Sequence, residues 1–201
     1  MQKDPRVYAR GVAPKLPDLR RILGLDMATR CGVAFTDIEV GKPVIKRPVY
    51  MDIWDLSIGT YDSGALRHLR LQQFLTVLAP DLIVFEDVKF TPAQELFKGR
   101  SIGAIVARTA TAAEFLGGLK ITLAMWAETH GIPCEGIGIS EIKKHATGKG
   151  NAGKSDMIRA CNEKFGTNFD PETFEETKVD NIADAAWVMD MGVEAYSEGL
   201  Q

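Results

Sequence analysis

Four carboxylates in this sequence occur where their neighbours would place them in or beside a folded core. Asp26 and Glu86 each follow a short apolar run of the kind that forms a buried strand. Asp180 and Asp184 lie four residues apart in a segment with helical periodicity, so they share one helix face. Each acid alone has an ordinary structural explanation, as a turn residue, a helix N-cap or a solvated strand end. Their chemistry therefore depends on whether the fold brings them together.

If the four acids converge, their charges need a counter-ion. Two unit charges about 4 Å apart repel by roughly 4 kcal/mol at an effective dielectric near 20. Mg²⁺ prefers carboxylate and water oxygens, and two such ions can hold the attacking and leaving oxygens of a phosphodiester displacement. His68, His130 and His145 lie in unrelated parts of the sequence, and the cysteines have no CxxC spacing. The residue types therefore favour a magnesium site over a zinc site.

Residues 148–155, GKGNAGKS, match the GxxxxGK[ST] pattern of a phosphate-binding P-loop. A P-loop follows a buried strand, whereas residues 141–146 are polar and have the pattern of a helix. We therefore reject the ATPase interpretation and expect no nucleotide cofactor. The loop still offers backbone N–H groups and Lys154 at a helix start, which can hold a phosphate of a nucleic-acid backbone.

The pattern of apolar residues predicts an α/β domain at residues 21–201, after a basic, flexible tail at residues 1–20. We expect strands at residues 21–26, 32–37, 48–53, 82–85 and 134–139. We expect helices within residues 61–78, 92–130 with a break near Gly117 and Gly118, 140–145 with Ser140 as N-cap, 154–164 and 180–196. Three strands in series, followed by alternating helices and strands, predict a mixed sheet flanked by helices.

Composition limits the class of protein. The 201 residues are 45% hydrophobic and 25% charged, which suits one domain with a real core. No apolar run approaches the roughly 18 residues of a membrane span, and the first residues lack a signal-peptide pattern, so we expect a cytoplasmic protein with no membrane partner. Residues 166–201 carry nine acids and one lysine. The remaining chain is therefore basic, which is compatible with a nucleic-acid partner.

The motifs together resemble the RuvC-type Holliday junction resolvases of the ribonuclease H-like superfamily. The resemblance covers most of residues 21–196 and rests on four segments in the same order: residues 22–34 with Asp26, residues 83–86 with Glu86, residues 141–155 with Lys143 and Lys154, and residues 180–186 with Asp180 and Asp184. It implies a ribonuclease H-like, mixed five-stranded sheet flanked by helices.

The resemblance also implies a Mg-dependent endonuclease that resolves four-way junctions as a homodimer. Asp26, Glu86, Asp180 and Asp184 would be the catalytic residues and would hold two Mg²⁺ ions, for which Mn²⁺ can substitute. The DNA-binding residues would be Lys143, Lys154, Lys89 and Phe90. Paired nicks in branched DNA require two active sites, because one site cuts one strand.

Three departures from the family pattern leave alternatives open. The two terminal aspartates are four apart where many members have three, so Asn181 could replace Asp180 as a ligand. The segment between Glu86 and Gly117 is about fourteen residues longer than expected, and Lys89 replaces a common aromatic residue, with Phe90 one position later. A related nuclease acting on RNA or flapped DNA, a non-catalytic junction-binding protein and an actin-like ATPase are the alternatives. The last would need two such domains.

Overall fold

The computed structural model describes residues 18–42, 48–88 and 102–198. Most of the predicted N-terminal tail lies outside these residues, as do Lys89 and Phe90. No helix in the described ranges has both the length and the apolar character that crossing a membrane demands.

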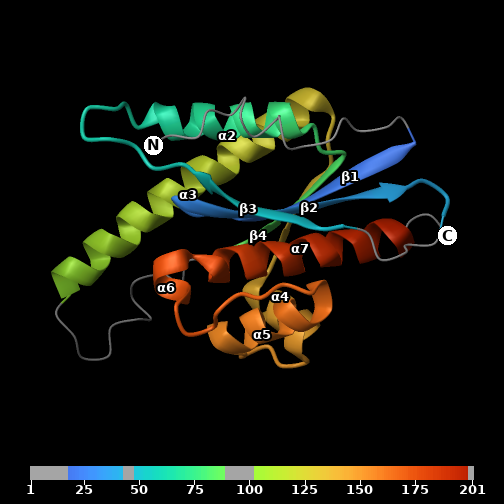
Figure 1. Cartoon of the computed structure of the whole chain (residues 1–201). Coiled ribbons are helices and arrows are strands. Elements are labelled where there is room, and N and C mark those ends of the chain that lie inside the picture. Colours follow the sequence, from blue (N-terminus) through green and yellow to red (C-terminus); the bar gives the residue numbers. More distant parts are fainter. Residues whose placement is uncertain (1–17, 43–47, 89–101, 199–201) are drawn as a thin grey trace.

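A mixed five-stranded sheet forms the centre of the molecule (Figure 1). Its strands are β1 (Leu19–Asp26), β2 (Arg30–Glu39), β3 (Tyr50–Asp55), β4 (Leu82–Glu86) and β5 (Cys134–Ile137). They lie in the order β3-β2-β1-β4-β5. The β1–β2 and β2–β3 pairs are antiparallel, whereas β1–β4 and β4–β5 are parallel. The predicted hairpin and the predicted mixed sheet are therefore confirmed.

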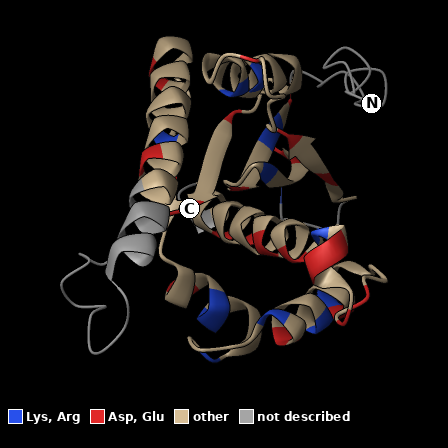
Figure 2. Ribbon diagram, turned by 90° about the vertical axis from the view of Figure 1, so that its left-hand side faces the viewer, with Lys and Arg blue, Asp and Glu red and all other residues tan. Residues whose placement is uncertain are grey.

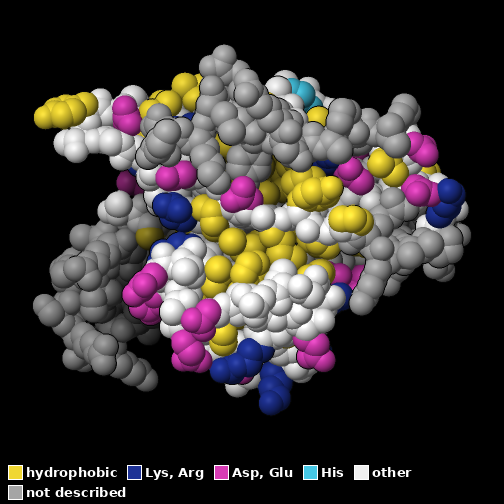
Figure 3. Space-filling model, viewed as in Figure 1, with side chains coloured by type: hydrophobic (Ala, Val, Ile, Leu, Met, Phe, Trp, Pro, Cys, Tyr) yellow, Lys and Arg dark blue, Asp and Glu magenta, His cyan; other side chains and the backbone are white. Residues whose placement is uncertain are grey.

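Helices cover both faces of the sheet (Figure 1). The helices are α2 (Ala65–Leu78), α3 (Ile102–His130), α4 (Ile139–Thr147), α5 (Lys154–Phe165), α6 (Phe174–Thr177) and α7 (Val179–Glu198). Helices α2 and α3 lie on one face, and α7 lies along the other with α4 and α5 beyond it. In the space-filling view, apolar side chains between these layers reach the surface across the middle of the molecule (Figure 3).

Alternation along β1 and β4 divides the core in two. Leu23 and Ile83 pack into the cluster beneath α2 and α3, whereas Ile22 and Val84 pack into the cluster beneath α7, because successive strand residues point to opposite faces. Helix α7 is buried between the sheet and α5, so its central residues are apolar around most of the helix. Side chains on this face of β1 and β4 therefore point toward α7.

Two local predictions were wrong, and one short helix was not predicted. Helix α3 runs without interruption through Gly117 and Gly118, because Leu119 and Leu123 bury its next turns in the core. Helix α4 begins at Ile139 after Gly138, not at Ser140; the Gly138 N–H donates to the Glu141 carboxylate at 3.4 Å, which supplies the cap from the third helical residue. The short α6 was not predicted.

Candidate metal centre

Strand pairing brings Asp26 and Glu86 together at one end of the sheet. β1 and β4 are parallel, with Leu25 opposite Phe85, and the next residues in this register are Asp26 and Glu86. Both acids also occupy the alternating positions that face α7, the face of Ile22 and Val84. Two carboxylates thus leave adjacent strands at the same end and on the same face, as the sequence predicts.

Helix α7 supplies the third acid because two glycines let it lie directly on the strands. A Cβ at Gly24 would lie 2.3 Å from the Ala185 carbonyl oxygen, and one at Gly32 would lie 1.9 Å from that of Asn181. No other residue fits these contacts. The close approach brings Asp184 to the strand ends, where one carboxylate oxygen from each of Asp26, Glu86 and Asp184 lies within 4.8 Å of the others. We call these three residues the sheet-edge site.

Burial and mutual repulsion make the sheet-edge site unfavourable for charge without an ion. Burial raises the pKa of Asp26 well above its ordinary value, and the charges of Glu86, Asp184 and Asp180 raise it further. Burial, then Glu86 and Asp180, raises the pKa of Asp184 to about 7. The pKa of Glu86 is also raised by burial, although the positive charges of Lys143 and Lys154 oppose the shift. An ion bound here would therefore relieve a repulsion that the fold creates.

Asp180 lies beside this site with its carboxylate divided between two environments. It is only 5% exposed, one of its oxygens accepts an ion-paired hydrogen bond from Lys154, and its Oδ1 is buried with no hydrogen-bond partner. A buried carboxylate oxygen without a hydrogen-bond donor is costly, and a bound metal ion is one way to satisfy it. The oxygen-only donor set and the unsatisfied Asp180 oxygen both fit Mg²⁺ or Mn²⁺.

Asn181, the alternative to Asp180, has another role. Its amide donates to the Arg30 carbonyl at 2.7 Å, at the turn of the β1–β2 hairpin. This hydrogen bond therefore attaches the start of α7 to the hairpin.

Two lysines border the sheet-edge site. Lys154, the first residue of α5, pairs with Asp180 and lies 5.3 Å from the centre of the Phe174 ring in α6. Its pKa is raised, first by the hydrogen bond with Asp180. Lys143 in α4 is close enough to lower the pKa of Glu86. Figure 2 marks lysine and arginine positions in blue along α4 and α5, the helices beyond α7. The predicted contacts of both lysines with DNA remain predictions.

The loop at residues 148–153 follows helix α4, as predicted, and precedes α5. A P-loop has a strand at this place. Asp190, which has the sequence context of a Walker B aspartate, lies in α7. The structure therefore agrees with the rejection of the P-loop interpretation.

Sequence reasoning missed two arrangements of charged residues. Lys120 of α3 pairs with Asp87 on the far side of β4, and His145 pairs with Asp190 between α4 and α7. Neither pair shares an element or a periodic spacing. The one usable signal was the four-residue spacing of Asp190 and Glu194, which predicts a common helix face.

The sheet order, the helices on both faces and the acids at the strand ends define a ribonuclease H-like α/β fold. Among solved structures, RuvC from Thermus thermophilus matches with a TM-score of 0.57 and 18% identity, over 84% of this chain and 90% of that chain. T. thermophilus RuvC in complex with a Holliday junction substrate matches with a TM-score of 0.58 and 17% identity, over 85% and 90% of the two chains. No family model and no curated protein matches the sequence. The expected resemblance to RuvC is thus confirmed for the fold.

Proposed function

We propose that this protein is a divalent-metal-dependent endonuclease that cuts four-way DNA junctions. The observation that carries the proposal is the convergence of Asp26, Glu86 and Asp184 from three separate elements on a fold shared with a junction-bound RuvC. A protein that only binds DNA gains nothing from buried acids facing phosphate, since they repel it. Hydrolysis explains why the acids gather here.

In this proposal the sheet-edge site and Asp180 hold the metal ions. Bound Mg²⁺, or Mn²⁺ in its place, would activate the attacking water and stabilise the leaving 3′ oxygen. The chain's own part is to fix the oxygen ligands before DNA arrives: Asp26 and Glu86 on paired strands, and Asp184 on a helix pressed against them. Lys143 would bind a backbone phosphate near the scissile one.

Lys154 would have two successive partners. Without metal it neutralises Asp180; a metal ion bound to that carboxylate would neutralise it instead, and the ammonium group could then pair with phosphate. Its side chain is 58% exposed whereas that of Asp180 is 6% exposed, so the lysine is the member of the pair that can turn toward DNA. Lys89 and Phe90, which follow Glu86 in sequence, would add contacts to the branched DNA.

Symmetric cutting of a junction requires a homodimer, because each active site cuts one strand. Helix α3 carries an apolar pair on one face, Ile121 and Met125, each 63% exposed. These side chains favour contact with a second copy of the chain over full solvation. Light scattering should give twice the chain mass of 22.0 kDa.

The decisive experiment offers the protein four labelled substrates in Mg²⁺: a four-way junction, a flap, a linear duplex and an RNA–DNA hybrid. We expect paired nicks in the junction and little cutting of the duplex. Preferential cutting of the flap or the hybrid would contradict the proposed junction substrate but agree with the proposed metal-dependent cleavage. Tight junction binding without cutting in either Mg²⁺ or Mn²⁺ would show a binding protein instead.

A further inference from the structure

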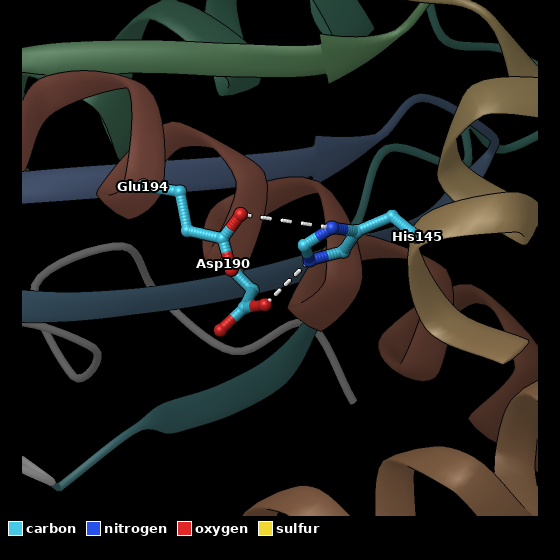
Figure 4. Close-up of side chains that lie close together, drawn as sticks. All are labelled: His145, Asp190 and Glu194. Atoms are coloured by element: carbon cyan, nitrogen blue, oxygen red, sulfur yellow. Dashed lines mark hydrogen bonds and ion pairs between the residues drawn. The ribbon is translucent and has the colours of Figure 1, made fainter. Parts of the chain in front are cut away.

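A second group of metal-ligand side chains lies between α4 and α7. His145 of α4 is placed between Asp190 and Glu194 of α7 (Figure 4). The His145 Nε2 lies 2.6 Å from Asp190 Oδ2, and its Nδ1 lies 3.8 Å from Glu194 Oε2. One ligand atom from each of the three residues lies within 4.8 Å of the other two. We call these three residues the helix site.

The two helices fix the geometry of this group. Asp190 and Glu194 are four residues apart and so project from one face of α7. The imidazole of His145 meets the Trp187 ring edge-on, with centroids 5.7 Å apart and planes at 80°, and Trp187 is only 4% exposed. A buried aromatic residue therefore holds the imidazole in place. The Glu194 side chain is 59% exposed, which leaves the group open to an ion from solvent.

The charges of the group leave room for a cation. Lys164 of α5 pairs with Asp190 through the same oxygen that faces His145. Two carboxylates and one lysine leave a net charge of −1 when the imidazole is neutral. The Lys164 side chain is 40% exposed, so it can turn into solvent when a metal ion takes its place.

We propose that His145, Asp190 and Glu194 bind a divalent transition-metal ion of the Zn²⁺ class. One imidazole nitrogen and two carboxylates suit Zn²⁺, which takes three protein ligands with water in the fourth position, better than Mg²⁺, which prefers oxygen ligands alone. Binding requires the neutral imidazole, so any proton on its ligating nitrogen leaves to solvent. The ion joins α4 to α7. This site is independent of the proposed nuclease activity.

The test uses the full chain with Asp26→Asn and Asp184→Asn, which removes two acids from the sheet-edge site. After chelator treatment, Zn²⁺ alone is titrated by calorimetry at pH 7.5 with millimolar Mg²⁺ present. We expect one saturable Zn²⁺ per chain and a melting temperature that rises with Zn²⁺ concentration, because the ion binds the folded state. Absence of saturable binding would leave the group as an ion-pair network and overturn the proposal.

Variants in this background assign the ligands. His145→Gln and Glu194→Gln should each lower the Zn²⁺ affinity at least about tenfold. Even loss of a residue that only supports a ligand lowers metal affinity about 10- to 100-fold. Lys164→Gln should tighten binding by removing a competing cation. Glu163→Gln, which makes the same charge change as Glu194→Gln at an exposed position on α5, should leave the affinity unchanged. If His145→Gln fails to fold, Glu194→Gln at its exposed position decides alone, and parent-like affinity there would overturn the proposal.

Discussion

Two clusters of acidic residues include side chains from α7, and they differ in how their negative charges are balanced. The sheet-edge site consists of three carboxylates, and burial with mutual repulsion raises the pKa values of Asp26 and Asp184. The helix site lies closer to the C-terminal end of α7 and contains its own hydrogen-bond donors, because His145 and Lys164 both face Asp190. The sheet-edge site lacks a matching set of basic partners, whereas the helix site has a lysine paired with one of its two carboxylates.

This difference follows from the elements that surround each group. The sheet-edge acids come from two strand ends and a helix pressed on them through Gly24 and Gly32, and the lysines that act on them, Lys143 and Lys154, come from α4 and α5. The helix site lies between helices, where Lys164 reaches in from α5. Asp180 is intermediate, with one oxygen paired to Lys154 and the other without a partner. We therefore expect chemistry at the sheet edge and stabilisation at the helix site.

Asp26→Asn should have the largest effect. It removes one ligand of the sheet-edge site, so cleavage should fall by more than the roughly 100-fold that loss of a supporting residue can cost. Junction binding should be kept or tightened, because a charge that repels phosphate is gone. Cleavage and binding are measured on the same labelled junction.

Glu135→Gln is the matched control, since this exposed acid lies in the same sheet, on β5 next to β4. It should cleave like the unmodified protein. Near-normal cleavage by Asp26→Asn would remove the functional distinction between the two acidic groups.

Asp180→Asn should have the next largest effect on rate. An amide oxygen binds Mg²⁺ more weakly than a carboxylate, so we expect turnover to fall about tenfold or more and the Mg²⁺ requirement to rise. Turnover is followed across a Mg²⁺ titration, well below the melting temperature.

Asn181→Ala is the paired variant. It loses only the hydrogen bond to the Arg30 carbonyl, so it should cost about 1 kcal/mol of stability and little activity. If the two variants behave in the opposite way, Asn181 is the ligand and Asp180 serves only Lys154 and the helix start.

Much of the sheet-edge site could be predicted from sequence because strand order and periodicity determine it. Apolar runs ending in Asp26 and Glu86 indicate strand ends, and parallel pairing puts such ends at the same edge. The four-residue spacing in α7 places Asp180 and Asp184 on one face. What the sequence does not show is how closely α7 approaches, since that depends on Gly24 and Gly32 facing helix backbone.

The wrong predictions share one physical cause, which is that tertiary contacts outweighed the local conformational preferences of the residues. Gly117 and Gly118 would end an isolated helix, yet burial of Leu119 and Leu123 keeps α3 continuous. The contacts of His145 were missed because its partners, Asp190 and Glu194, lie 45 and 49 residues away on another helix. Pairings between helices that are distant in sequence leave no periodic signal.

The raised pKa values predict an unusual pH dependence for the metal-free protein. The folded state holds protons on Asp26 and Asp184 more tightly than the unfolded chain does, so stability is greatest below about pH 4 for these groups and falls as pH rises toward the Asp184 pKa of about 7. Each carboxyl group that is protonated in the folded state and ionised in the unfolded chain should lower the melting temperature by roughly 3 °C per pH unit in this range.

Scanning calorimetry with chelator between pH 5 and 8 measures this slope. Mg²⁺ should restore stability at pH 8 and do little at pH 5, where protons occupy the carboxylates. Asp184→Asn should flatten the metal-free curve, because the neutral amide has no proton to lose. Equal slopes in the two proteins would mean that the sheet-edge acids are not the source of the pH dependence.

The smallest predicted effect concerns Lys154, which lies where the sheet-edge site meets the loop before α5. If Lys154 leaves Asp180 for a DNA phosphate, Lys154→Ala should weaken junction binding a fewfold and lower the slope of log affinity against log salt by about one. Binding is measured in Mg²⁺ on an Asp26→Asn background, which prevents cleavage. Lys149→Ala removes an equal charge from the loop before α5, where the backbone of Lys149 is hydrogen-bonded to Thr147; a smaller change in slope is expected there. Should Lys154→Ala leave the salt slope unchanged and only lower the melting temperature, the lysine would be a fixed partner of Asp180. The carboxylate beside the sheet-edge site would then resemble Asp190 in the helix site, with a basic side chain permanently balancing its charge.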